Sequence, residues 1–65
     1  MINSHDEARE LIGKAFWWRN TRAILISIDE KQNDPEILRC RVSQVDAMYH
    51  RSERDAAIFL TDISI

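Results

Sequence analysis

Residues 22–28 read Arg-Ala-Ile-Leu-Ile-Ser-Ile, and this stretch decides the fold class. Isoleucine recurs in it at every second position, and β-branched side chains at a period of two predict a strand rather than a helix. The alanine and the leucine at the intervening positions make the opposite face partly apolar as well. We therefore expect this strand to lie in the centre of a sheet, with its isoleucines together on one face.

Two elements are expected before the central strand. Residues 4–7, Ser-His-Asp-Glu, match a capping box, and apolar residues follow them at helical spacing. The helix is expected to end near Gly13 rather than to continue through residues 16–18, Phe-Trp-Trp, which suit a strand better. A strand at about residues 14–19 then forms an antiparallel hairpin with the central strand, through a short turn at residues 20–21.

The pattern after the central strand is less regular. Residues 29–36 form a polar break with turn-forming residues, and alternation resumes over residues 37–42 as a further strand. Residues 43–50 fit both helical and strand spacing, so both assignments stay open. The charged residues 51–55 are expected to form a loop, and residues 56–63 are expected to form the last strand.

This order of elements predicts an α+β fold. An N-terminal helix is expected to pack on a strongly curled antiparallel sheet of four short strands, or five, with an SH3-like or Sm-like small barrel as the favoured form. The layout of a capped helix followed by short strands is similar to that of Sm-like proteins, without a residue-by-residue match to a motif of that family. Residues 1–65 are expected to form a single domain, because a chain of this length can build only one core.

The composition is that of a globular protein. Hydrophobic residues make up 45% and charged residues 31%, which excludes a disordered tail or a low-complexity linker. The formal net charge of −2 gives no general attraction to nucleic acids or to anionic membranes. No apolar run is long enough to span a membrane, the start MINSHDEARE lacks the pattern of a secretory signal, and Cys40 has no second cysteine to pair with. We therefore expect a cytoplasmic protein.

The residues that could carry chemistry do not match a known pattern. His5, Cys40 and His50 lack the spacing of a metal site, so neither a metal nor another cofactor is expected. Cys40 could act as a nucleophile with His50 as its base, but it shares a strand face with Leu38 and Val42, where a cysteine is usually a buried, protonated thiol. One glycine is too few for a phosphate-binding loop. No catalytic residues, and hence no enzymatic activity, are expected.

A cluster of aromatic and basic residues supplies the first candidate binding site. Trp17 and Trp18 are followed by Arg19 and Arg22, and Trp beside Arg is typical of protein interfaces and of platforms that stack on bases. Because neighbouring side chains on a strand point to opposite faces, the two indoles cannot face the same core. Trp18 shares its face with Phe16, which makes the larger apolar surface, so Trp17 is expected to be exposed. The alternative is that both faces of the sheet are covered and both indoles pack.

Two further candidate binding residues lie on the later strand. Arg39 and Arg41 alternate with apolar residues and are expected to point outward together. They could bind carboxylate or phosphate groups of a partner, or they could pair with acidic residues across the sheet.

These residues predict a non-enzymatic binding or regulatory module that acts by protein–protein contact with a partner of unknown identity. Its size fits the small inhibitors and adaptors carried by phages and mobile elements. A homo-oligomer is also expected, because Ile63 and Ile65 alternate onto one face and would form an exposed apolar edge. The alternative is a small barrel that binds single-stranded nucleic acid through its tryptophans and arginines, which the acidic net charge disfavours.

Overall fold

The computed structural model describes residues 2–65, which form one short α-helix and a five-stranded antiparallel sheet. The strands lie in the order β4-β3-β2-β1-β5. The expected antiparallel sheet with one helix is confirmed, and it has five strands. The elements along the chain are α1 (His5–Arg9), β1 (Ala15–Trp18), β2 (Thr21–Ile28), β3 (Ile37–Val45), β4 (Arg51–Phe59), the 3₁₀ turn η1 (Leu60–Asp62) and β5 (Ile63–Ser64).

Helix α1 is capped as expected, but it is shorter than the sequence suggests. The Ser4 hydroxyl accepts a hydrogen bond from the Glu7 amide at 3.2 Å. The α-helix ends at Arg9 rather than near Gly13, because the chain then turns to bond with β2: the Gly13 amide donates to the Leu25 carbonyl at 2.7 Å. Gly13 has a φ of +84°, a left-handed conformation that glycine adopts without strain.

Strand β2 is central, as expected, but its isoleucines do not form the core face. Ala23 and Leu25 are fully buried, whereas Ile24 and Ile26 are half-buried. The register with β3 shifts between Leu25 and Ser27, which marks a β-bulge with Ile26 as the extra residue. The bulge interrupts the period of two, so the expectation of one isoleucine face is wrong.

Strands β3 and β4 form a long hairpin that resolves the ambiguous region. Residues 46–50 form its turn, and the residues before them continue β3. The loop expected at residues 51–55 is wrong: each of these residues pairs in register with a residue of β3 and stays exposed to water. The single strand expected over residues 56–63 is also divided, because β4 ends at Phe59 and η1 separates it from β5.

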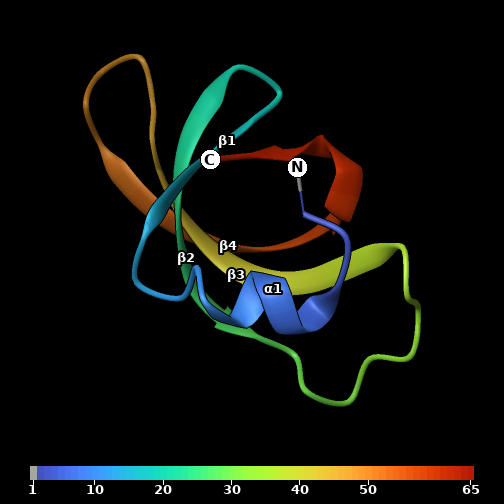
Figure 1. Ribbon diagram of the computed structural model, residues 1–65. Helices are drawn as coiled ribbons and strands as arrows, with labels where there is room; N and C mark the ends of the chain where they lie inside the picture. Colours follow the sequence, from blue (N-terminus) through green and yellow to red (C-terminus); the bar gives the residue numbers. More distant parts are fainter. Residues whose placement is uncertain (1) are drawn as a thin grey trace.

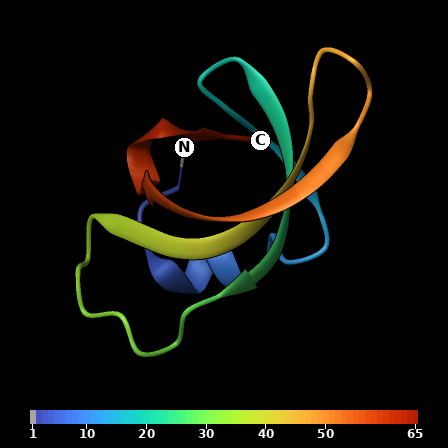
Figure 2. The same cartoon turned by 180° about the vertical axis from the view of Figure 1, so that it is seen from behind.

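The core lies against the inner face of the sheet. Figures 1 and 2 both show α1 across one end of the sheet, below β2 and β3, while the β1–β2 and β3–β4 turns project from the opposite end. The edge strands β4 and β5 do not pair with each other within residues 2–65, so the sheet is open. The buried apolar residues are Ile2, Ala8, Leu11, Phe16, Trp18, Ala23, Leu25, Leu38, Cys40, Val42, Ile58, Leu60 and Ile63.

Candidate functional site

Trp17 is the exposed member of the tryptophan pair, as the sequence predicts. Its exposed fraction is 44%, against 9% for Trp18. Arg22 is its cross-strand partner on β2, and the Arg22 guanidinium carbon lies 4.9 Å from the centroid of the Trp17 ring. Ser64 of β5 is its partner on the other side. We call these three residues the Trp17 patch: an indole stacked with a guanidinium, which is typical of the centre of protein interfaces.

The β1–β2 turn fixes the geometry of this patch. Arg19 and Asn20 have φ angles of 52° and 61°, and a two-residue turn with both residues left-handed matches the twist of a hairpin. The turn lies one residue earlier than the sequence predicts. Because so short a turn allows a single register, it holds Trp17 opposite Arg22.

Trp18 lies on the opposite face of β1, and two arginines cover its ring. The guanidinium carbons of Arg19 and Arg54 each lie 5.4 Å from the ring centroid. Arg54 belongs to β4, opposite the buried Val42, and its Nε donates to the Gln44 side-chain oxygen at 3.0 Å. The Trp18 indole Nε1 is buried and has no hydrogen-bond partner within residues 2–65.

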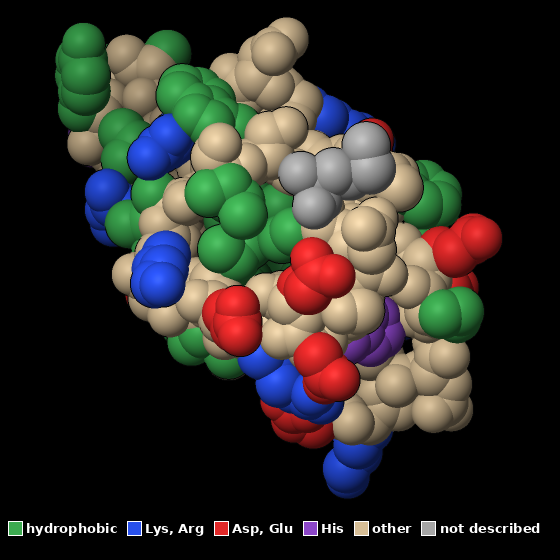
Figure 3. Space-filling model, viewed as in Figure 1, with side chains coloured by type: hydrophobic (Ala, Val, Ile, Leu, Met, Phe, Trp, Pro, Cys, Tyr) green, Lys and Arg blue, Asp and Glu red, His purple; other side chains and the backbone are tan. Residues whose placement is uncertain are grey.

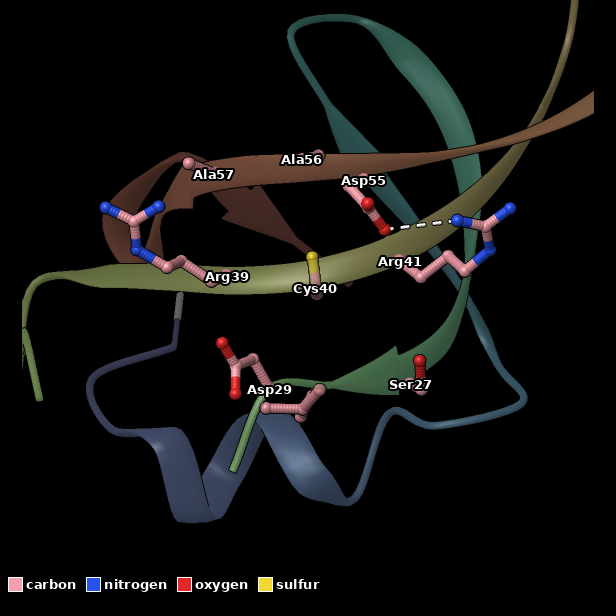
Figure 4. Close-up of a pocket in the computed structure, with 9 residues that line it drawn as sticks. Ser27, Asp29, Arg39, Cys40, Arg41, Asp55, Ala56 and Ala57 are labelled. Atoms are coloured by element: carbon pink, nitrogen blue, oxygen red, sulfur yellow. Dashed lines mark hydrogen bonds and ion pairs between the residues drawn. The ribbon is translucent and has the colours of Figure 1, made fainter. Parts of the chain in front are cut away.

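Arg39 and Arg41 are both exposed on β3, as expected, and they line a shallow pocket of about 530 Å³ (Figure 4). The charge of Arg41 is paired, because its guanidinium lies 3.4 Å from Glu53 and 3.1 Å from Asp55. Arg39 makes no ion pair with any described residue. Cross-strand pairing therefore accounts for Arg41 and leaves Arg39 available to a partner.

Cys40 lies between these two arginines, and its burial, expected from the sequence, is confirmed (Figure 4). Burial, together with the nearby Asp55 carboxylate, raises the pKa of the Cys40 thiol to about 11. A thiol with this pKa is protonated at neutral pH and is a poor nucleophile. His50 lies in the β3–β4 turn, whereas Cys40 pairs with Ala56 in the middle of the hairpin, so the structure does not bring the two together.

The tip of the β3–β4 hairpin is an apolar feature that sequence reasoning missed. Met48 is 74% exposed and Tyr49 is 89% exposed there. The Asp46 carboxylate orders the turn, because one of its oxygens accepts hydrogen bonds from the amides of Met48 at 2.8 Å and His50 at 2.9 Å. Figure 3 shows hydrophobic side chains gathered over this end of the molecule, with basic side chains beside them and acidic ones over α1. Asp46 is the sequence signal that could have located this turn, because aspartate side chains often accept hydrogen bonds from turn amides.

The six residues expected to bind a partner do not form one surface. Trp17 and Arg22 lie together on the outer face of the sheet, and the two arginines of β3 lie over the pocket described above. Trp18 and Arg19 lie together on the inner side, where Arg54 joins them. Arg54 is a functional candidate outside the six residues that the sequence predicts for binding.

The described residues also lack two kinds of feature. No group of three or more His, Cys, Asp or Glu side chains lies close enough to hold a metal ion in residues 2–65. The same residues contain no helix with the length and apolar character needed to cross a membrane. In comparisons with known proteins, no family model, curated protein or solved structure matches this chain.

Proposed function

We propose that this chain is a non-enzymatic protein-binding module, a small adaptor or inhibitor of the reducing cytoplasm, and that it binds its partner through the Trp17 patch. The observation that carries the proposal is the half-exposed indole of Trp17, held against Arg22 by a fixed cross-strand register. Covering the exposed 44% of a side chain of roughly 250 Å² removes about 110 Å² from water. At about 25 cal/mol per Å², this is about 3 kcal/mol, or about a hundredfold in affinity.

The charges on the outer face favour a protein over a nucleic acid as the partner. A nucleic-acid track needs a continuous row of unpaired cations. Glu53 interrupts such a row. It pairs across the sheet with Ser43, which in turn pairs with Ile24. Ile24 is the next residue after Arg22 on the same face of β2, so Glu53 lies in the row that Arg22 would begin. Glu53 also neutralises Arg41, the next arginine along the sheet.

We also propose that the sheet is an open, Sm-like small barrel and that copies of the chain associate through its edges. The strand order and the single 3₁₀ turn between β4 and β5 support this arrangement. Strand β4 is nine residues long and has one unpaired edge, and Ile65 is 80% exposed beside β5. The sequence predicts that Ile63 shares this exposed surface with Ile65. This prediction is wrong, because Ile63 pairs with Trp18 and is buried in the core.

The partner-binding proposal is tested by affinity capture from the native host with three versions of the chain: wild type, Trp17→Ala and Phe59→Ala. Phe59 is a matched control, because it is also a half-exposed aromatic residue, 50% exposed, on a different strand. The dissociation constant of the captured protein is then measured with each purified version. We expect Trp17→Ala to weaken binding by about a hundredfold and Phe59→Ala by less than about threefold.

Two results would overturn the proposal. One is a captured partner whose affinity is unchanged by Trp17→Ala, or reduced equally by both replacements. The other is binding of a labelled single-stranded oligonucleotide with a dissociation constant near or below about 1 µM that weakens steeply with salt, which would favour nucleic-acid binding.

The association of copies is tested by light scattering at about 100 µM, a concentration at which weak edge pairing is populated. A mass of at least twice 7.7 kDa is expected. Ile65→Asp should lower this mass, and Ile12→Asp, at a residue 44% exposed elsewhere, should not. A monomeric mass for the wild-type chain would contradict the proposal.

A further inference from the structure

The inner face of the sheet becomes polar at the end that carries the two hairpin turns. Cross-strand partners share a face, so Arg54, opposite the buried Val42, occupies a position that faces the core. Gln44 and Ser52 are partners on the same face, one step nearer the turn. Alternation alone would place apolar side chains at these positions, as it does at Leu38 and Ile58 farther along the same hairpin.

This polar end brings two positive charges to one aromatic ring. The Arg19 and Arg54 guanidinium carbons, each 5.4 Å from the Trp18 centroid, lie within about 11 Å of each other. Neither arginine makes an ion pair with a described residue. Asp62 lines the same hollow as Arg19, but it lies outside ion-pair distance. Two guanidinium groups that contact the same ring and have no carboxylate partner create a positive region that attracts an anion.

The side chains at this ring also have hydrogen-bond donors without partners. The bond from Arg54 Nε to Gln44 leaves the two terminal nitrogens of the guanidinium free to donate. The Trp18 Nε1–H is a further donor, buried and without an acceptor. A buried donor without a partner is rare in folded proteins and is often explained by a bound ion or water.

We infer that Trp18, Arg19 and Arg54 form an oxyanion-binding site, which takes a single carboxylate or phosphate group at the open end of the sheet. The site differs from the Trp17 patch because Trp18 and Arg54 lie on the inner face, although Arg19 at the turn also lines a hollow with Trp17 and Ser64. The Arg54 guanidinium, which Gln44 positions, contacts the anion, and Arg19 adds its charge to the site. The site favours a single anionic group over an extended polyanion. Among the described residues, Arg19 and Arg54 are the only unpaired cations at this end of the inner face.

The test is an NMR titration of the isotope-labelled full chain, in which the indole N–H signals of the two tryptophans report separately on the two faces. Sodium phosphate is added in one arm and sodium malonate in the other, with ionic strength held constant by chloride. We expect a saturable shift of the Trp18 signal, with an apparent dissociation constant below about 10 mM in at least one arm. The arm that saturates at lower concentration identifies whether the natural group is a phosphate or a carboxylate.

Two matched replacements decide whether the shift comes from this site. Arg54→Gln should weaken binding by at least about fivefold, and Arg54→Lys should retain part of it, because Lys keeps the charge but not the fork of donors. Arg22→Gln, which removes the guanidinium stacked on Trp17, should change the affinity by less than about twofold. All three replacements are at exposed residues, and the same spectra show whether each variant is folded.

The inference is overturned if the shifts are linear in both arms, or if Arg54→Gln binds as the wild type does. Equal losses in Arg54→Gln and Arg22→Gln would show general charge screening instead. If Arg54→Gln leaves anion binding unchanged and promotes aggregation, the role of the Arg54 charge is to protect edge strand β4 from pairing, not to bind an anion. Failure of the Trp17 proposal does not affect these outcomes, since Trp17→Ala should bind the anion normally.

Discussion

Replacing each tryptophan by alanine should separate the two faces of β1 by a measurable difference in stability. The exposed fractions of Trp18 and Trp17, 9% and 44%, differ by about a third of a surface of roughly 250 Å², which is about 90 Å². At about 25 cal/mol per Å², Trp18→Ala should destabilise the fold by about 2 kcal/mol more than Trp17→Ala. The total cost of Trp18→Ala should reach about 3–5 kcal/mol, because the replacement also leaves a cavity in the core.

The assay is urea unfolding followed by far-UV circular dichroism, since fluorescence changes with the number of tryptophans. A domain of 65 residues has a stability of about 3–10 kcal/mol, so Trp18→Ala is expected to lose most of its folded population or all of it. Trp18→Phe keeps an aromatic ring and removes the unpartnered N–H, so it provides a folded variant for the comparison with Trp17→Phe. Equal losses of stability in the two alanine variants would refute the reasoning, because burial would then not govern their contributions.

Replacements at three further positions test other parts of the structure. The thiol of Cys40 ionises near its ordinary pKa of 9.0 in the unfolded chain, but it stays protonated to about pH 11 in the native protein. The free energy of unfolding should therefore fall as pH rises through this interval. Urea unfolding measured over a series of pH values should show a smaller fall for Cys40→Ala. Gly13→Ala should cost about 1 kcal/mol in thermal or urea unfolding, because a φ of +84° strains an alanine although nothing lies within 4 Å of the added Cβ. Asp46→Ala should speed amide exchange at Met48 and His50 severalfold, whereas Asp46→Asn, which keeps an acceptor oxygen, should have a smaller effect. Exchange as slow in Asp46→Ala as in the wild type would contradict the role of the carboxylate.

The elements that follow from local chemistry could be predicted from the sequence. The Ser4 cap, the β1–β2 hairpin and the burial of Cys40 depend on neighbouring residues and on simple alternation, and the structure confirms each of them. The exposure of Trp17 follows from the same alternation, since one side of β1 had to carry the larger apolar surface.

The features that could not be predicted depend on the register between distant strands. The bulge at Ile26 changes which residues of β2 face the core, and no local signal marks it. The charged residues 51–55 have the composition of a loop, yet pairing with β3 makes them a strand. The contact of Arg54 with Trp18 joins β4 to β1, which are not neighbours in the sheet, so it depends on the tertiary fold rather than on the pattern of either strand.

The adjacent tryptophans lie on opposite faces of β1, and their surroundings therefore favour different kinds of binding. Each indole is stacked by arginine, but Trp17 is half-exposed with Arg22 beside it, whereas Trp18 is buried beneath Arg19 and Arg54. On the outer face, the indole itself is the surface that a partner would cover, so affinity there should follow apolar area and depend weakly on salt. On the inner face, the indole is already covered and only the charges remain free, so binding there should weaken as salt rises. The salt dependence of each site is therefore determined by which side of β1 its tryptophan occupies.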